Sequence, residues 1–480
     1  MKKIWIGAIL SGLIFLYLLG LRLDFFCKEI PYLPPLSDLQ KISGKETWMN
    51  IFQHDRKIGY SHRSFIPTDN GYQLSDFASM RINTMGMAQD LHIRTKGNLN
   101  SDHTLDSFDF DLQSGLFNFK AHGKVKGRIL TVFIDKQKIK IPIAENLYIA
   151  AGILDTAVDS GLEPGRTIMF SVFDPATMGK RPVRITMIGD EVLDIMGRKQ
   201  NTKKLSVDFM GASQSAWIGE DGSVVREEGL FGIIFKKVAK KEALDSLAVT
   251  PSRDLTRIAS IASNVSLNQP EGLKLLRLKI TGVNDILFLN GGRQTFKKQI
   301  LTIRRETFSS PSEISTNRPD KDQNLFLEPT PFIQSDHPKI KKKVFEIVSP
   351  GDSPLTKARK LNSWIYKNID KRPVLSVPNA LQTLKNRVGD CNEHAVLLAA
   401  MARAAGIPAQ VEAGLVYLNG RFYYHAWNVL DLNEWITADS LMGQIPADVT
   451  HIHLIRGGID QQVDLIGVIG KIEITILEQS

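Results

Sequence analysis

The chain has 480 residues, of which 43% are hydrophobic and 23% charged, with 60 Lys and Arg, 51 Asp and Glu, and two Cys. This composition excludes a wholly disordered chain, a collagen-like chain and a polytopic membrane protein. The length predicts two or three domains, and two cysteines are too few for a disulfide-based scaffold. The net charge of +9 favours an anionic neighbourhood such as a membrane surface. Because aromatic residues are not interleaved with the basic ones, we expect no nucleic-acid binding.

The N-terminus carries a membrane-targeting pattern. Lys2 and Lys3 precede an apolar run from Ile4 to Leu21, which is just long enough to cross a hydrocarbon core of about 30 Å. We therefore predict a single-pass transmembrane signal anchor with its two lysines in the cytoplasm. The bulk of the chain is then expected on the periplasmic or extracytoplasmic side of the inner (cytoplasmic) membrane.

Two other interpretations fit the N-terminus less well. A cleaved signal peptide requires a small-x-small site after the apolar run, and the residues from Leu19 to Asp24 offer none. A lipoprotein with Cys27 as the lipidated residue is disfavoured, because the preceding Phe25 and Phe26 are too large for a lipidation site. Cys27 itself has no assigned role.

The middle of the chain is predicted to be β-rich. Polar and apolar residues alternate with a period of two, as in Lys138 to Ile141, and Asp221-Gly222 indicates a hairpin turn. A short helix is predicted near Leu147 to Val158, and the sheet is expected to form a sandwich or a strongly curved sheet. The predicted boundaries are a signal anchor at 1–23, a linker at 24–46, a β-rich domain at 47–245, a small β domain at 246–307, a linker at 308–324 and a mixed α/β catalytic domain at 325–480.

Helical patterns begin in the C-terminal domain. Asp336 is predicted to cap a helix with Pro338 in its first turn, and Ser353 to cap the next with Pro354 at its first position. A third, short helix is predicted over Asn379 to Lys385.

The residues around Cys391 predict an activated thiol. An apolar stripe after Cys391 predicts a helix, for which Asp390 is the N-cap and Glu393 completes a capping box. Cys391 then lies in the first helical turn, where the helix dipole is expected to lower its pKa. Gly389 permits a sharp turn before the helix.

A histidine and an aspartate follow on predicted strands. Asn419-Gly420 is a strong hairpin signal, and His425 lies in the second strand of that hairpin. If the next turn has three residues centred on Leu432, Asp439 lies directly opposite His425 on one face of the sheet. The carboxylate would then hold the imidazole in one tautomer.

Three blocks of residues resemble the transglutaminase-like superfamily, of the bacterial membrane-anchored envelope type: Gly389-Asp390-Cys391, Tyr424-His425-Ala426-Trp427 and Trp435 to Asp439. The resemblance implies an α+β papain-like core with Cys391 as nucleophile, His425 as general base and acid, and Asp439 as orienting residue. Gly389, Asp390 and Trp427 are implied as supporting residues. The chain departs from the family pattern at Val429, where many members carry an acidic residue, and at Ser440-Leu441, where members commonly carry Pro-Thr.

The resemblance also implies a reaction. Cys391 would attack a glutamine side-chain amide or a peptide amide of a protein substrate and form a thioester. A primary amine or water would resolve it, so acyl transfer and hydrolysis both remain open, and no metal or other cofactor is expected. The alternatives are a cysteine peptidase of the cell envelope and a non-catalytic scaffold that uses the same fold to bind peptides.

Other roles for the same residues were considered. Cys391 is read alternatively as a buried structural thiol, as a zinc ligand with His394 or with His451 and His453, or as a disulfide partner of Cys27. The first is disfavoured by the matched histidine and aspartate, the second by poor ligand spacing, and the third because the helix would have to lie at the membrane. His451 and His453 are interpreted as packing or solvent-facing residues. Trp427 and Tyr423 share the strand face of His425 and either pack in the core or exclude water.

Overall fold

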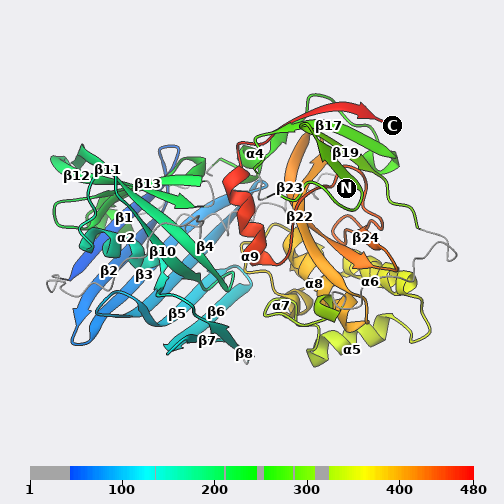
Figure 1. Ribbon diagram of the computed structural model, residues 1–480, viewed down its shortest axis with the longest axis horizontal. Helices are drawn as coiled ribbons and strands as arrows, with labels where there is room; N and C mark the ends of the chain where they lie inside the picture. Colours follow the sequence, from blue (N-terminus) through cyan, green and yellow to red (C-terminus); the bar gives the residue numbers. More distant parts are fainter. Residues whose placement is uncertain (1–43, 136, 210–211, 246–252, 285–286, 309–323) are drawn as a thin grey trace. The chain divides into compact units, whose positions relative to one another are not determined.

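The computed structural model describes residues 44–135, 137–209, 212–245, 253–284, 287–308 and 324–480. The described residues fall into two units, a β-rich unit within 44–255 together with 375–377, and a C-terminal unit within 256–374 together with 378–480; the strands and helices of each unit are drawn in Figure 1. The predicted signal anchor at 1–23 lies outside the described residues. Within the part of the chain that is described, no helix is both long and apolar enough to cross a membrane.

The β-rich unit is built on one continuous 15-stranded sheet. From β1, strands β2 to β8 follow one another on one side, and β15 back to β9 follow on the other, so that β1 and β15 join the two halves. The strands are β1 (Lys45–Gln53), β2 (Arg56–Thr68), β3 (Gly71–Thr84), β4 (Met87–Asn100), β5 (Leu105–Ser114), β6 (Phe117–Lys126), β7 (Ile129–Ile134), β8 (Gln137–Pro142), β9 (Leu147–Ile149), β10 (Thr167–Asp174), β11 (Gly179–Ile195), β12 (Arg198–Phe209), β13 (Ala212–Ile218), β14 (Val224–Glu228) and β15 (Ile233–Val238).

The period-two pattern of the sequence explains this sheet. In β6, for example, buried and exposed residues alternate along most of the strand, because successive side chains of a strand point to opposite faces. The predicted hairpin at Asp221-Gly222 is formed, but five residues rather than two connect its strands, and Ile218 pairs with Val224. The β-rich prediction for this region is therefore confirmed, with a single sheet in place of a two-sheet sandwich.

The helix expected near Leu147 to Val158 is α2 (Ala150–Asp159), and it is buried. It packs against β3, β9 and β10, which come from both halves of the sheet, so the sheet curves around it. Two acidic residues of this buried helix have basic partners: Asp155 forms an ion pair with Arg63, and Asp159 lies 3.6 Å from Lys45. Buried charges need such partners, because an isolated ion in the interior is costly.

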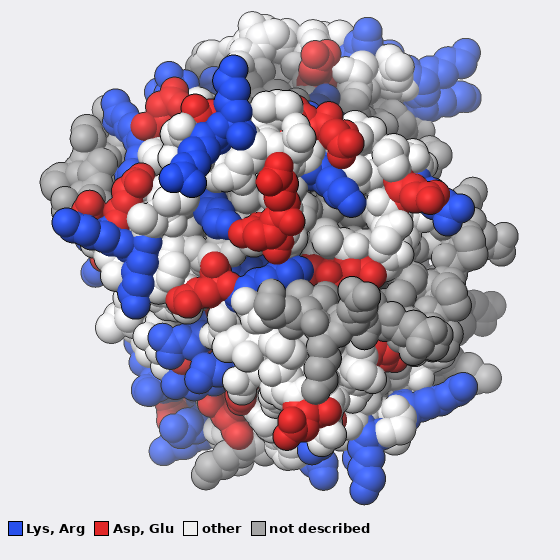
Figure 2. Space-filling model, turned by 90° about the vertical axis from the view of Figure 1, so that its left-hand side faces the viewer, with Lys and Arg blue, Asp and Glu red and all other residues white. Residues whose placement is uncertain are grey.

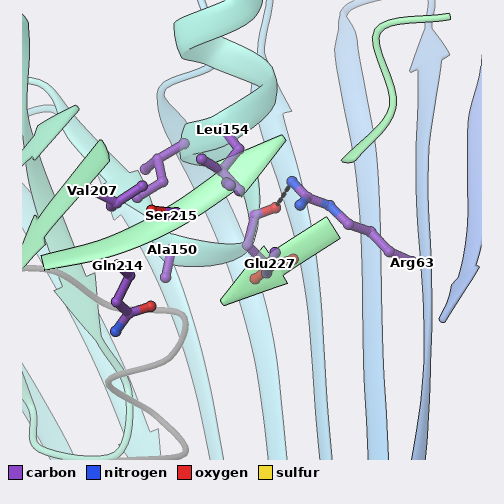
Figure 3. A pocket seen from close by; sticks show the side chains of 10 residues that line it. Arg63, Ala150, Leu154, Val207, Gln214, Ser215 and Glu227 are labelled. Atoms are coloured by element: carbon purple, nitrogen blue, oxygen red, sulfur yellow. Dashed lines mark hydrogen bonds between the residues drawn. The ribbon is translucent and has the colours of Figure 1, made fainter. Parts of the chain in front are cut away.

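A small hollow lies beside α2, as Figure 3 shows. Its volume is about 30 Å³, which is room for roughly one water molecule. Arg63 reaches into this region and donates a hydrogen bond to the carbonyl of Ala151. The polar lining residues labelled in the figure are Arg63, Gln214, Ser215 and Glu227.

Charge is mixed over the surface that Figure 2 presents. Lys and Arg side chains lie interspersed with Asp and Glu, and no broad field of one sign covers the described part of that face. Exposed ion pairs also join neighbouring strands of the sheet, such as Arg81 with Asp90 at 2.7 Å.

The C-terminal unit consists of helices packed on a five-stranded sheet. The order is β16-β23-β22-β25, with β24 paired to β23. Helix α8 packs against β22 and β23, and α5, α6 and α7 pack against α8. The elements are α4 (Leu255–Ala259), β16 (Ile261–Ala262), α5 (Pro338–Ile347), α6 (Pro354–Asn368), β20 (Asp370–Lys371), α7 (Ala380–Asn386), β21 (Val388–Gly389), α8 (Cys391–Ala404), β22 (Ala409–Leu418), β23 (Arg421–Asp431), β24 (Trp435–Ala438), β25 (Ile452–Arg456) and α9 (Ile459–Gln462).

A second sheet in this unit includes the predicted small β segment. Strands β17 (Leu275–Thr281), β18 (Gln294–Lys297) and β19 (Ile300–Arg304) form a sheet in the order β18-β19-β17-β26. The last strand, β26 (Glu473–Gln479), comes from the C-terminus and pairs antiparallel with β17. Buried Leu276, Leu278 and Ile280 of β17 thus belong to the same unit as α8.

Ser353 caps α6 as predicted, because it accepts a hydrogen bond from the backbone of Thr356. The third helix, predicted over Asn379 to Lys385, is α7 (Ala380–Asn386), and Asn379 is its N-cap and accepts a hydrogen bond from the backbone of Gln382. For α5 the cap is His337 and not the expected Asp336. The imidazole of His337 lies one residue closer to Pro338 and accepts from the N–H of Lys339.

Candidate active site

Cys391 is the first residue of α8, as the capping pattern predicts. Asp390 accepts a hydrogen bond from the N–H of Asn392 at 3.1 Å, and Glu393 accepts from the N–H of Asp390 at 3.0 Å, so the capping box is formed. A Cβ atom at Gly389 would lie 2.3 Å from the Cβ of Glu393. Glycine is therefore required here because the capping side chain passes close to its Cα, and not because of an unusual φ angle.

The thiol of Cys391 lies in a closed and negatively charged environment. The residue is 1% exposed, and burial raises its pKa well above the ordinary value, with the carboxylates of Asp390, Glu393 and Asp439 adding to the effect. A hydrogen bond from the backbone of Ala426 opposes this shift. The lowered pKa expected from the helix N-terminus is thus outweighed by burial of the thiol, to which the two acidic side chains of the capping box add.

The hairpin that carries His425 is formed as predicted. Leu418 pairs with Arg421 across Asn419-Gly420, and both turn residues have positive φ angles, 47° and 83°, as the tight hairpin turn requires. The bond from Ala426 to Cys391 shows that the sulfur lies next to the peptide group that follows His425.

Asp439 reaches His425 through a register that differs from the predicted one. The turn after β23 has three residues, but Asp431 pairs with Trp435, so the turn is centred on Asn433 and not on Leu432. Asp439 therefore follows the pair Asn428–Ala438 and lies diagonal to His425 instead of directly opposite. Since the difference is two residues, the side chains remain on one face of the sheet.

The His425–Asp439 pair is buried and closely hydrogen-bonded. Nε2 of His425 donates to Oδ2 of Asp439 at 2.6 Å, while Nδ1 of His425 is buried and has no hydrogen-bond partner among the described residues. Oδ1 of Asp439 accepts from the backbone N–H groups of Leu441 at 2.7 Å and Met442 at 2.9 Å. Burial alone would raise the pKa of Asp439, but His425 and then His451 outweigh it and hold that pKa far below its usual range. Asp439 is therefore ionised at neutral pH.

Trp427 forms one wall of this arrangement. Its ring is 1% exposed and lies 6.0 Å from the ring of His425. Its Nε1 donates to Glu412 at 2.9 Å, and Glu412 is in turn paired with Arg456. Trp427 is thus both a core residue and a neighbour of the imidazole.

His451 is buried, which agrees with the packing alternative, but the sequence gives no sign of its polar contacts. Its Nε2 lies 3.0 Å from Oδ2 of Asp439 and its Nδ1 lies 3.3 Å from Oδ1 of Asp448. The available signal was the Asp448-Val449-Thr450 segment, since an Asp two residues before a Thr is typical of a fixed turn. That signal predicts order, but it does not predict contact with Asp439.

The metal-binding alternatives can be compared with the geometry. Among the described residues, one group has three donor atoms within 4.8 Å of one another, namely His425, Asp439 and His451. Two of these atoms are only 2.6 Å apart, whereas ligands of a tetrahedral zinc ion lie roughly 3.3 Å apart at usual bond lengths. The contacts are thus those of hydrogen bonds.

Cys391 and His394 do not form the zinc pair considered from the sequence. Cys391 belongs to no such donor group in the described part of the chain. His394 is buried and directs its Nδ1 to the carbonyl of Asp390 at 2.7 Å. Burial lowers the pKa of His394 to about 4, so its ring is neutral at pH 7.

A helix that begins at a cysteine and packs on a sheet carrying a histidine and an aspartate defines the core of a papain-like α+β protein. Residues 341–440 match the family model of the transglutaminase-like superfamily. This segment, which contains Cys391, His425 and Asp439, belongs to that superfamily. No curated protein matches the chain significantly.

Solved structures give weaker similarities. A proposed cysteine protease from Cytophaga hutchinsonii is 16% identical, with a TM-score of 0.27, over 43% of this chain and 87% of its own. A β-barrel-like protein of unknown function from Brucella abortus is 10% identical, with a TM-score of 0.32, over 42% of this chain and 97% of its own. A proposed protease from Parabacteroides distasonis is 11% identical, with a TM-score of 0.18, over 67% of this chain and 68% of its own. TM-scores below 0.5 do not establish a common fold.

Proposed function

We propose that the C-terminal unit is a cysteine acyltransferase or amide hydrolase that acts on peptide or protein amides. In this proposal Cys391 is the nucleophile, His425 the general base and acid, and Asp439 the residue that orients His425. The observation that carries the proposal is that the two ring nitrogens of His425 have different surroundings. Its Nε2 is hydrogen-bonded to Asp439, while its Nδ1 has no hydrogen-bond partner in the described part of the chain, and the thiol lies beside the next peptide group.

The chemistry follows from these positions. As the Cys391 sulfur attacks the amide carbonyl, Nδ1 of His425 takes the thiol proton, and the imidazolium then donates it to the departing nitrogen. The C–N bond breaks, an amine or ammonia leaves, and a thioester remains on Cys391. Water resolves the thioester to a carboxylic acid, or a primary amine resolves it to a new amide, with His425 accepting the proton of either acceptor.

The resting site is expected to contain a neutral thiol rather than a thiolate. Burial and the acidic neighbours raise the pKa of Cys391, so the proton moves to His425 only when the substrate carbonyl is in place. Asp439 then stabilises the imidazolium through its short hydrogen bond to Nε2. This is general-base activation of the thiol.

The test is a product analysis. A peptide containing Gln and Lys is incubated with the full chain and with Cys391→Ala, and the products are examined by mass spectrometry. Loss of ammonia with coupling supports transglutamination, loss of ammonia with gain of water supports deamidation, and backbone cleavage supports a peptidase. Cys27→Ser is the matched control and is expected to behave as the wild type. Identical product profiles for wild type and Cys391→Ala would overturn the proposal.

The second candidate is a non-catalytic peptide-binding scaffold. The observation in its favour is that Cys391, His425 and Asp439 are each 2% exposed or less, so all three side chains lie beneath the surface. The same experiment separates the two candidates, because a scaffold retains the peptide without changing its mass.

We also propose that residues 1–23 anchor the protein in the inner membrane with the rest of the chain on the periplasmic side. The support is the sequence pattern of Lys2, Lys3 and the apolar run from Ile4 to Leu21. Deletion of residues 1–23 is expected to move the protein from the membrane to the soluble fraction. The measurement is N-terminal sequencing of the protein purified after expression of the full chain. An N-terminus that lies after Leu21 would refute an uncleaved anchor.

A further inference from the structure

A second histidine binds the aspartate of the proposed triad. Oδ2 of Asp439 accepts from Nε2 of His425 at 2.6 Å and lies 3.0 Å from Nε2 of His451. The side chain of His451 is fully buried. Because both imidazoles meet the same oxygen, a change in either one alters the charge and orientation of the carboxylate seen by the other.

His451 is held from its other side by a second aspartate. Nδ1 of His451 lies 3.3 Å from Oδ1 of Asp448, and that oxygen also accepts from the backbone N–H of Thr450 at 2.8 Å and its hydroxyl at 2.6 Å. Oδ2 of Asp448 accepts from Gln444 at 3.0 Å. The ring of Trp427 packs at 86° to the imidazole, with centroids 5.2 Å apart. The position of His451 is therefore fixed on three sides.

Both ring nitrogens of His451 face carboxylates, so both act as donors and the ring is a cation. Burial disfavours this charge, but Asp448 and then Asp439 outweigh it and raise the pKa of His451 to about 9. The charged or titratable groups around it are Asp448, Asp439 and His425, together with Arg293, whose guanidinium donates to the carbonyl of His451 at 3.0 Å.

We infer that His451 is a positioning residue of the proposed Cys391 chemistry, which keeps Asp439 ionised and directed at His425 while Asp448 supplies the balancing charge. The inference rests on the proposed function of Cys391. Asp448, His451 and Asp439 together carry a net charge of −1, so His425 still experiences one negative charge, as it would from a lone aspartate. The arrangement adds a fixed geometry without removing the charge that stabilises the imidazolium of His425.

Removal of the cation has a specific consequence. With a neutral residue at position 451, Asp439 and Asp448 would be two buried carboxylates without the cation between them, and like charges disfavour ionisation. The pKa of Asp439 would then rise, and protonated Asp439 could no longer stabilise the imidazolium of His425. Activity would fall and would recover as the pH is raised. A second removal, Asp448→Asn, takes away the competing carboxylate and restores the net charge of −1.

The experiment compares pH profiles of kcat and KM for the full chain with the Gln- and Lys-containing peptide. His451→Gln is expected to lower kcat by roughly 10- to 100-fold, as losses of outer-shell hydrogen bonds do, with KM changed less than about threefold. Its acidic limb should move upward by roughly one pH unit or more. In the double variant with Asp448→Asn the acidic limb should return toward that of the wild type, so that the two losses are not additive.

His453→Gln is the matched control. His453 is also buried, but it is not among the described residues that form hydrogen bonds with the carboxylate of Asp439. Its acidic limb should match the wild type. The inference is overturned if His451→Gln and His453→Gln have the same pH profile, or if the double variant shows the product of the two single losses. A wild type with no more turnover than Cys391→Ala would instead overturn the proposed function, so the two failures are distinguishable.

Discussion

The buried carboxylate of Asp439 gives a quantitative prediction for stability. In Asp439→Asn the amide oxygen can still accept from the N–H groups of Leu441 and Met442, which now bind Oδ1. The amide nitrogen then replaces Oδ2, and it presents hydrogens to the two imidazole N–H groups of His425 and His451. Two hydrogen bonds to a charged acceptor are lost, and buried His451 keeps only Asp448 as counter-charge.

The magnitude follows from these two contacts. Hydrogen bonds to charged groups contribute about 1.5–3 kcal/mol each, and removal of one partner of a buried ion pair costs about 3–5 kcal/mol. Since the two effects describe the same contacts, we expect Asp439→Asn to lower the free energy of unfolding of the C-terminal unit by about 3–5 kcal/mol at pH 7.

Cys391 itself supplies the assay for this unit. In a Cys27→Ser background, its buried sulfur reacts with a short pulse of thiol reagent only where the C-terminal unit is unfolded, so labelling against urea concentration gives the transition. The control is Asp370→Asn, which makes the same chemical change at an exposed aspartate paired with Arg372 at the surface, where a loss of about 0–1 kcal/mol is expected. A loss for Asp439→Asn no greater than that of Asp370→Asn would refute the reasoning.

The pH dependence of the effect has a definite sign. The folded-state pKa of Asp439 is depressed below its ordinary value of 3.8, so the stabilisation is fully present above about pH 4 and is lost as the pH falls further. The difference between wild type and Asp439→Asn should therefore be constant from pH 7 down to about 5 and shrink only in stronger acid. A difference that already disappears at pH 6 would contradict the assigned charge state.

Three further outcomes are expected. Gly389→Ala should destabilise the C-terminal unit by about 1–3 kcal/mol, the usual cost of overpacking, because its Cβ would collide with Glu393; unchanged urea unfolding would refute this. Iodoacetamide should alkylate Cys391 at least about tenfold more slowly in the native Cys27→Ser protein than in urea, since the thiol is buried and its pKa raised, and equal rates would show an open site. In the β-rich unit, burial raises the pKa of Asp159 to about 6. Asp159→Asn should therefore stabilise that unit by about 1 kcal/mol at pH 8, and by less at pH 5, where the wild-type carboxyl is protonated. Thermal unfolding at the two pH values measures the difference.

Features fixed by neighbouring residues could be predicted from the sequence. The capping box of α8 needs only Asp390 and Glu393, three residues apart, and the turn at Asn419-Gly420 needs only two residues that accept positive φ. The alternation in β6 follows from the geometry of a single strand. For the same reason, the likeness of the Cys391 block to its superfamily could be recognised in isolation.

Features that depend on distant contacts could not be predicted in this way. The predicted register between β23 and β24 differs from the observed one by two residues. A three-residue turn can be centred on either Leu432 or Asn433, and the choice depends on which side chains become buried. The expected acidity of Cys391 considered the helix dipole alone, which is a short-range effect, and omitted the larger cost of burying a thiolate beside two carboxylates.

The contact between His451 and Asp439 could not be predicted from local sequence patterns. Its own segment indicates only a turn held by Asp448 and Thr450, and nothing within a few residues points to Asp439. The two meet because β25, which begins just after His451, pairs with β22, while β22 also pairs with β23, the strand that carries His425. The contact therefore depends on two strand pairings at once. Each pairing costs chain entropy, which only the interactions of the packed sheet offset. A cation placed at that junction has an effect on a carboxylate twelve residues away in the chain, and the pH profiles of His451→Gln and its double variant measure that effect directly.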